Sequence, residues 1–180
     1  FPKHPFGFKV LGVVLKQTGR LVESLAPMQS AVRLSSQDAE AHSNLAGILK
    51  ELGRLDEAEG SYRRAIALKS DYAEAHYNLG VTLRDLGRLD EAEAGYRQAI
   101  ALKPGFFEAH SNLGVTLKAL GRLKEAEISY RQAIALKSDC AEAHSHLGGI
   151  LKELGRLEEA EGSYGRAIAL NSDHAEAHYN

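Results

Sequence analysis

The chain has 180 residues, of which 44% are hydrophobic and 26% charged, a composition that indicates a folded protein and excludes a disordered tail. The formal net charge is −2, and residues of both signs are interspersed without a basic stripe, so we expect no nucleic-acid partner. The early apolar run at residues 10–15 is too short to span a membrane and lacks signal-peptide features, and a single cysteine excludes an intrachain disulfide. We therefore expect a cytoplasmic protein that has no membrane partner.

The sequence repeats itself every 34 residues. Ala-Glu-Ala-His begins at residues 39, 73, 141 and 175, with Phe-Glu-Ala-His at residue 107, and 73 − 39 = 34. Stepping back by the same period places residues 5–38 in a divergent first repeat, and residues 1–4 look like the tail of an earlier one. The sequence thus predicts one array, residues 1–180, that contains these repeats and the start of a sixth at 175–180: 5–38, 39–72, 73–106, 107–140 and 141–174.

Each repeat is predicted to form two short helices. In residues 73–106, Leu79 and Leu83 recur at helical spacing, Gly87 interrupts the pattern, and apolar residues resume at Ala92 and Tyr96. Small residues at one position of the first helix should let the paired helices cross closely: Ala46, Gly80, Gly114 and Gly148.

The predicted helices begin with acidic residues. In three repeats an aspartate is followed three residues later by a glutamate, which predicts a capping box at the first helix: Asp71 with Glu74, Asp139 with Glu142, and Asp173 with Glu176. The second helix of residues 73–106 should begin near Asp90 and Glu91, which favour the positive end of the helix dipole.

These spacings, small residues and seam alanines resemble the tetratricopeptide repeat family over essentially the whole chain. The resemblance implies an all-α, right-handed superhelical solenoid of antiparallel helix hairpins. Two columns depart from the family pattern. A column of histidines stands where the family usually has an aromatic residue early in the first helix. The family also favours a proline at the end of the repeat, and here only Pro104 fits, with serine at the equivalent positions Ser70, Ser138 and Ser172.

The histidine column is a candidate for chemistry because imidazole can act as a base, a metal ligand or a pH switch. Its members are His42, His76, His110, His144 and His178. Equivalent residues of successive repeats are separated by two helices, each about 8–10 Å from its neighbour, so they cannot share a metal. We interpret the column as packing residues, and we expect no metal site and no cofactor.

Two further arrangements invite a catalytic or metal-binding interpretation. His174 and His178 lie four residues apart, but they offer only two ligands. Cys140 precedes a predicted helix and His144 follows it, yet Tyr72 and Phe106 occupy equivalent positions. Because Ser, His and Asp recur in every repeat, they do not single out a triad. We expect no enzymatic activity.

An amide column is the strongest candidate for binding. It comprises Asn44, Asn78, Asn112 and Asn180, with His146 interrupting it. A leucine that should be buried in the core comes directly after each of the first three asparagines in the sequence. The neighbouring amides should therefore project from the first helices along one surface. An amide carries a donor and an acceptor, which suits the backbone of a bound peptide. The column resembles the asparagine ladder in the repeat region of O-linked N-acetylglucosamine transferases and repeats found ahead of bacterial glycosyl- and sulfotransferase domains.

Charged residues and an aromatic residue accompany this column. We include Tyr77 and a basic column in the candidate peptide-binding surface: Lys50, Arg84, Lys118 and Lys152. Glutamates near the helix starts make the surface mixed in sign. Chaperone-binding members of the family have Lys or Arg where this chain has Ser43, Tyr77 and Ser111, so an acidic chaperone tail is not the expected ligand.

The sequence favours a protein-interaction module that binds an extended peptide or partner protein in the groove of its first helices. A self-assembly scaffold is an alternative, and so is the substrate-recruiting arm of a larger transferase. Neither end has a polar capping face, so apolar residues around Phe6, Phe8 and Val10, and around Tyr164 and Ile168, should support self-association.

Overall fold

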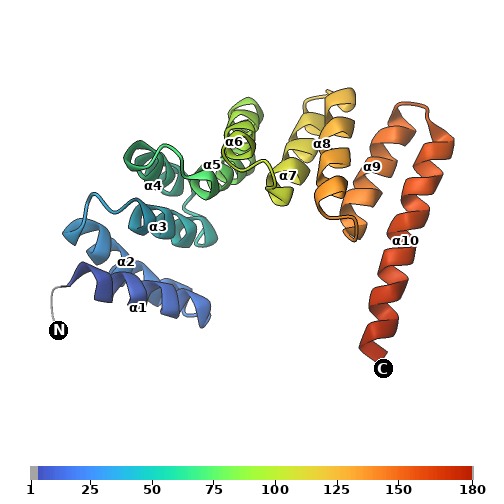
Figure 1. The fold of residues 1–180 in the computed structure, drawn as a ribbon. Coiled ribbons are helices and arrows are strands. Elements are labelled where there is room, and N and C mark those ends of the chain that lie inside the picture. The colour runs from blue at the N-terminus through green and yellow to red at the C-terminus, as the bar shows by residue number, and fades with distance from the viewer. Residues whose placement is uncertain (1–3, 180) are drawn as a thin grey trace. The chain divides into compact units, whose positions relative to one another are not determined.

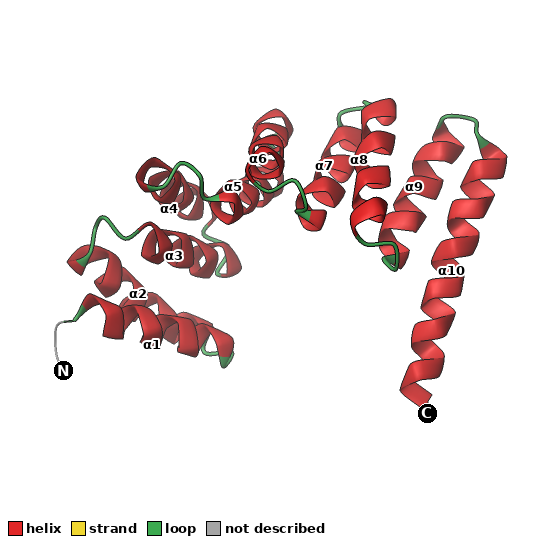
Figure 2. Cartoon of the chain, viewed as in Figure 1, coloured by secondary structure: helices red, strands yellow, loops and turns green. Residues whose placement is uncertain are grey.

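The computed structural model describes the backbone of residues 4–179 and the side chains of residues 4–171. This part of the chain contains ten α-helices and no strand (Figure 1, Figure 2). It divides into two compact units, one ending at Leu102 and the other beginning at Lys103. The helices of the first unit are α1 (Pro5–Gln17), α2 (Leu21–Leu34), α3 (Ala39–Glu51), α4 (Leu55–Leu68), α5 (Ala73–Asp85) and α6 (Leu89–Leu102). Those of the second unit are α7 (Phe107–Ala119), α8 (Leu123–Leu136), α9 (Ala141–Glu153) and α10 (Leu157–Tyr179).

The two helices of each repeat pack against each other as a hairpin, as the repeat pattern predicts. Within the first unit α2 also packs on α3, and α4 on α5; within the second unit α8 packs on α9. Each of these second helices is therefore shared between its own repeat and the next one. Stacking of this kind buries faces that a single hairpin would leave in water.

A glycine in the left-handed region makes the hairpin turn possible. Gly53 follows α3 with φ of 75°. Its amide donates to the carbonyl of Lys50 at 2.9 Å, and the amide of Arg54 donates to that of Leu49 at 2.9 Å. These two bonds form a Schellman motif, which satisfies the last carbonyls of the helix. The period-34 glycines at equivalent turns have the same conformation: Gly19, Gly87, Gly121 and Gly155.

The residues predicted to fill the seam are buried. Ala92, Tyr96 and Ala99 of α6 have no exposed surface. Gly80 of α5 lies so close to Tyr96 that a Cβ there would be 2.9 Å from the ring atom Cε1. The prediction that a small residue permits close crossing is confirmed, because the tyrosine ring occupies the space a side chain would need.

The predicted aspartate caps of α5 and α9 are wrong. The N-cap residues are Tyr72 and Cys140, and neither side chain makes a capping hydrogen bond. Both helices begin one residue later than the capping-box pattern requires, so Asp71 and Asp139 lie one position too early to cap. Only α3 has an aspartate cap among the described first helices, where the carboxylate of Asp38 accepts from the amide of Ala41 at 3.0 Å. The predicted acidic first turn of α6, at Asp90 and Glu91, is confirmed.

The last helix differs from the repeat pattern. α10 runs without interruption from Leu157 to Tyr179, through the positions where earlier repeats have a short connection. Asp173 therefore lies inside a helix and does not begin one. The side chains of His174 and His178, and Asn180 as a whole, lie outside the described residues.

Candidate functional site

The first helices of the first unit line a polar hollow of about 240 Å³. We call it the amide hollow and define it by six of its lining residues: Lys16, Asn44, Lys50, Tyr62, Tyr72 and Asn78. Three of these residues belong to the predicted binding surface and come from α3 and α5. The 34-residue period brings the two asparagines to neighbouring helices, because each occupies the same position in its repeat.

The amides of Asn44 and Asn78 are available to a ligand. Both side chains are half-buried. Within the described part of the chain, neither side-chain amide forms a hydrogen bond. Lys50 is likewise half-buried and forms no ion pair there. The hollow therefore presents amide donors, amide acceptors and a cation that have not been satisfied internally.

A neighbouring ion pair and a buried tyrosine shape the edge of the amide hollow. Nζ of Lys16 lies 2.8 Å from Oε1 of Glu51 and links α1 to α3. Burial raises the pKa of the Tyr62 phenol well above its ordinary value, and the charge of Glu51 acts in the same direction. Tyr62 is therefore a neutral hydroxyl at physiological pH. The hollow is lined by side chains of both charges, with no strong excess of either sign.

Two residues of the predicted surface that belong to the first unit, Tyr77 and Arg84, do not line this hollow. The ring of Tyr77 packs on that of Tyr96, with 5.9 Å between centroids, so it serves the hairpin core of its own repeat. A guanidinium nitrogen of Arg84 lies 3.3 Å from a carboxylate oxygen of Asp85. The structure therefore divides the predicted set, since Tyr77 and Arg84 have partners outside the hollow.

The second unit places the remaining predicted residues on α7 and α9. Asn112 is half-buried on α7. His146, which interrupts the amide column, stacks on Tyr130 with 5.4 Å between ring centroids, and its Nε2 lies 3.3 Å from Oε1 of Glu142. The imidazole of His146 is thus held by two neighbours, Tyr130 and Glu142.

The basic residues of the second unit also lie on these helices. Lys118 pairs with Glu153 at 2.8 Å, and Lys152 is exposed on α9. The Lys118–Glu153 pair occupies the same repeat positions as the Lys16–Glu51 pair of the first unit, 102 residues later. An ion pair between successive first helices is therefore a recurring feature of this surface.

The histidine column has a structural role that the sequence pattern did not reveal. Nε2 of His76 lies 2.9 Å from the carbonyl oxygen of Ser70, six residues earlier. The same contact recurs from His42, His110 and His144 to the carbonyls of Ser36, Pro104 and Ser138, at 3.1, 3.0 and 3.0 Å. Each imidazole therefore fastens its helix to the connection that precedes it. The constant spacing of six residues was the available signal.

A second missed feature is a closed ring of ion pairs between successive second helices. Arg63 contacts Glu59 at 2.8 Å and Glu91 at 3.0 Å, and Arg88 contacts the same two carboxylates at 2.6 and 2.7 Å. In the second unit, Arg131 contacts Glu127 at 2.9 Å and Glu159 at 3.2 Å, and Arg156 contacts both at 2.7 and 2.6 Å. The identical rings lie 68 residues apart, which is two repeats.

The rings change the acidity of their carboxyl groups. Burial alone would raise the pKa of Glu59, but hydrogen bonds and positive charge from Arg63 and Arg88 outweigh it, and the pKa lies below its ordinary 4.5. The pKa of Glu127 is lowered in the same way by Arg131 and Arg156. These carboxylates are therefore charged at neutral pH.

The described residues offer little support for a metal site or for a reactive cysteine. Within the described residues, no group of three or more His, Cys, Asp or Glu side chains is arranged to hold a metal ion. Cys140 is partly exposed at the N-cap position of α9 and makes no capping bond. None of the described helices combines the length and apolar character that crossing a membrane requires.

The family model of the tetratricopeptide repeat matches residues 43–105, 77–139 and 112–175, so the chain belongs to the tetratricopeptide repeat family. No curated protein matches it.

Solved structures show the same fold at low sequence identity. A MamA fragment from Desulfovibrio magneticus RS-1 superposes with a TM-score of 0.87 at 18% identity, covering 94% of this chain and 96% of its own. PilF of Pseudomonas aeruginosa gives 0.83 at 21% identity, with coverage of 92% and 75%. YrrB, described as a tetratricopeptide repeat protein with an unusual peptide-binding site, gives 0.80 at 21% identity, with coverage of 98% and 91%. These similarities establish the fold.

Proposed function

We propose that this chain is a protein-interaction module whose first helices bind an extended peptide through its backbone. The observation that carries the proposal is the amide hollow, in which Asn44 and Asn78 present unsatisfied amides beside Lys50. A primary amide can donate to a peptide carbonyl and accept from a peptide N–H. Such contacts are indifferent to the side chains of the ligand.

The spacing of the repeats suits an extended ligand. Asn44 and Asn78 lie on α3 and α5, which contact each other, and extended peptide advances about 3.3 Å per residue, so a few residues of peptide would span both amides. In the second unit, Asn112 occupies the corresponding position on α7, and His146 occupies it on α9. The peptide-binding site that the description of YrrB assigns to that protein supports a similar role on this fold.

The proposal is tested with a peptide selected for binding from a random library displayed on phage. Replacing both asparagines (Asn44→Ala with Asn78→Ala) removes two hydrogen bonds worth about 0.5–1.5 kcal/mol each, so we expect Kd to rise roughly 5- to 150-fold. Gln132→Ala is the matched control, because it removes an exposed amide from α8. An unchanged Kd in the double variant would remove the amides from the mechanism.

A second candidate is self-association through the end hairpins, favoured by the exposure of α1. Leu11 is 47% exposed, whereas equivalent leucines in the later repeats are at most 9% exposed. Val14 is 46% exposed, whereas Ile48 and Ile150 at the same position have no exposed surface. On α3, α5 and α9 the preceding second helix of the same unit packs against the first helix, and α1 has no such neighbour among the described residues. At the opposite end, Ile168 of α10 is 66% exposed.

Head-to-tail stacking would place α1 of one copy on α10 of another, as α3 packs on α2 within the chain. Sedimentation over a wide protein concentration range tests this, and we expect a concentration-dependent dimer that disappears in Leu11→Glu with Val14→Glu. A monomer at every concentration contradicts it. The role of a substrate-recruiting arm rests on the resemblance to transferase repeats alone, and the sequence that follows residue 180 in the intact gene would test it.

A further inference from the structure

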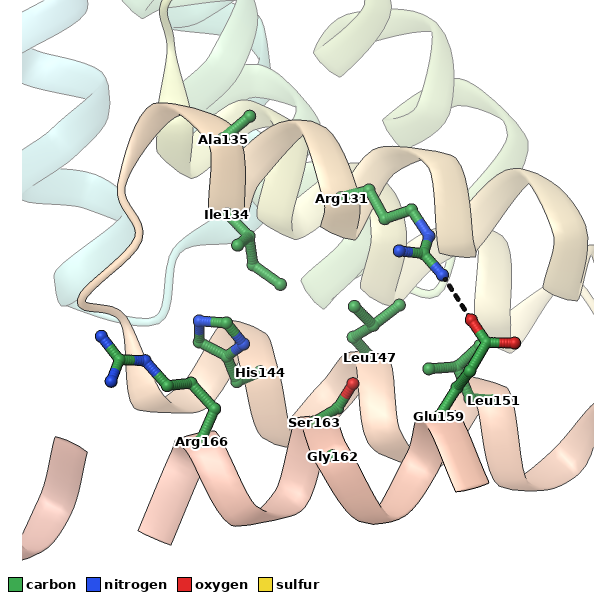
Figure 3. Close-up of a pocket in the computed structure, with 10 residues that line it drawn as sticks. All are labelled: Arg131, Ile134, Ala135, His144, Leu147, Leu151, Glu159, Gly162, Ser163 and Arg166. Atoms are coloured by element: carbon green, nitrogen blue, oxygen red, sulfur yellow. Dashed lines mark hydrogen bonds and ion pairs between the residues drawn. The ribbon is translucent and has the colours of Figure 1, made fainter. Parts of the chain in front are cut away.

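A pocket of about 480 Å³ lies in the second unit between α8, α9 and α10, and we call it the outer pocket (Figure 3). Its floor is apolar and consists of Ile134 from α8 with Leu147 and Leu151 from α9. Gly162 lies on the α10 wall, where a Cβ would meet no atom within 4 Å. The missing side chain leaves the pocket open to a side chain of another molecule. This outer pocket contains none of the residues assigned to peptide-backbone binding.

Two arginines stand at opposite ends of this floor (Figure 3). Arg131 belongs to the ion-pair ring, in which two guanidinium groups are balanced by the carboxylates of Glu127 and Glu159. Arg166 lies beside His144 at the other end. Across the described residues, Arg166 has no ion pair and no hydrogen bond. The outer pocket therefore combines an apolar floor with one positive charge that has no acidic partner among the described side chains.

The first unit contains the same pocket without that charge. Its lining residues lie 68 positions earlier, between α4, α5 and α6, and enclose about 500 Å³. Ile66, Leu79 and Leu83 repeat the apolar floor. Gln98 occupies the position of Arg166. The chain thus provides an internal comparison in which the three apolar floor residues recur and the charge is absent, with Ala94 in place of Gly162.

We propose that the outer pocket of the second unit binds a partner segment in which a leucine-sized residue is followed by a glutamate or aspartate. The apolar side chain lies on Ile134 and Leu147, and the carboxylate pairs with Arg166. An apolar surface rewards burial of the aliphatic group, and a guanidinium forms charge-assisted hydrogen bonds with a carboxylate. This docking site is separate from the amide hollow.

The test is a titration of the ¹⁵N-labelled chain with the peptide acetyl-Gly-Ser-Leu-Glu-Ser-Gly-amide, followed by amide chemical shifts. We expect saturable shifts on α8, α9 and α10, with Arg166→Gln weakening binding about tenfold. Substituting serine for the leucine of the probe should abolish the shifts on α8, α9 and α10. Equal affinity of the Arg166→Gln variant, or shifts confined to the first helices of the first unit, would overturn the proposal.

Two further variants separate the pocket from the fold. Gly162→Ile installs the residue found at the equivalent position of the preceding repeat, Ile128, and should block the pocket while helix content stays unchanged by circular dichroism. Gln98→Arg should create binding in the first unit. The Asn44→Ala with Asn78→Ala variant should show the same shifts on α8, α9 and α10 as the parent chain, so failure of the amide hollow and failure of this pocket are distinguishable. Unchanged probe binding by Gly162→Ile would also overturn the proposal.

Discussion

Nη1 of Arg88 lies 2.6 Å from Oε2 of Glu59, a contact that joins the second helices of adjacent repeats. Arg63 and Glu91 close the ring around them. The side chain of Glu59 is only 14% exposed, whereas the other three members are at least 39% exposed. Glu59 is therefore the member whose charge depends most on the ring, and Glu127 occupies the same place in the second unit.

Glu59→Gln should destabilise the first unit. It leaves the guanidinium groups of Arg63 and Arg88 without one of their two carboxylates, and the exposure of both arginines limits the loss to about 0.5–1 kcal/mol. Glu57→Gln is the matched control, because Glu57 pairs only with Arg54 of its own repeat. Urea unfolding measures both. A larger loss for Glu57→Gln would contradict a role for the ring between repeats.

The rings also predict a pH dependence. Because the folded pKa of Glu59 and of Glu127 is below the ordinary 4.5, the stability they contribute is fully present above pH 4.5 and is lost as the pH falls through the folded values. Unfolding free energy measured from pH 7 to pH 3 should therefore fall more steeply for the parent chain than for Glu59→Gln with Glu127→Gln. Identical slopes would show that the rings do not contribute.

The histidine column should contribute to stability through its hydrogen bonds to carbonyls. His76→Leu removes the bond to Ser70 and should cost about 0.5–1.5 kcal/mol, whereas His76→Gln, which keeps a donor at similar reach, should cost less. Thermal unfolding compares the two. Equal stability of both variants would mean that the imidazole only fills space.

Replacing two glycines by alanine should change the free energy of unfolding in opposite directions. Gly87 has φ of 77°, so Gly87→Ala forces a side chain into the left-handed region and should destabilise by about 1–2 kcal/mol. Gly60 lies inside α4, where an added Cβ would meet no atom within 4 Å, so Gly60→Ala should stabilise by up to about 1 kcal/mol. Chemical denaturation decides both signs. A stabilising Gly87→Ala would contradict the Schellman turn.

The repeat period predicted the hairpins because one spacing controls turns, seams and small residues together. Gly53 and Tyr96 could be placed from the sequence alone, since each position recurs with the same environment. The start of α5 near Asp71 could not be placed in this way. Its local pattern matches a capping box, but the helix begins one residue later, at Ala73, with Tyr72 as the N-cap. The continuation of α10 beyond the repeat boundary was also missed, because the repeat pattern predicts a connection where the helix continues.

The candidate site was predicted in part. Asn44, Asn78 and Lys50 share the amide hollow as a helical surface would require. Tyr77 and Arg84 have the right periodicity, but their contacts with Tyr96 and Asp85 depend on side-chain direction, which spacing does not determine. The ion-pair rings join residues 28 or 29 positions apart, and no local pattern identifies such pairs.

The most direct test of the central claim follows the side-chain NH₂ resonances of Asn44 and Asn78 in a ¹⁵N-labelled chain during titration with a selected peptide. If the amides bind the peptide backbone, both pairs of resonances shift and saturate with the same Kd as the complex. Methylating a single backbone nitrogen of the peptide removes one N–H donor. Binding should weaken only when that N–H donates to Asn44 or Asn78. Resonances of both asparagines that stay in place at saturation would contradict the account.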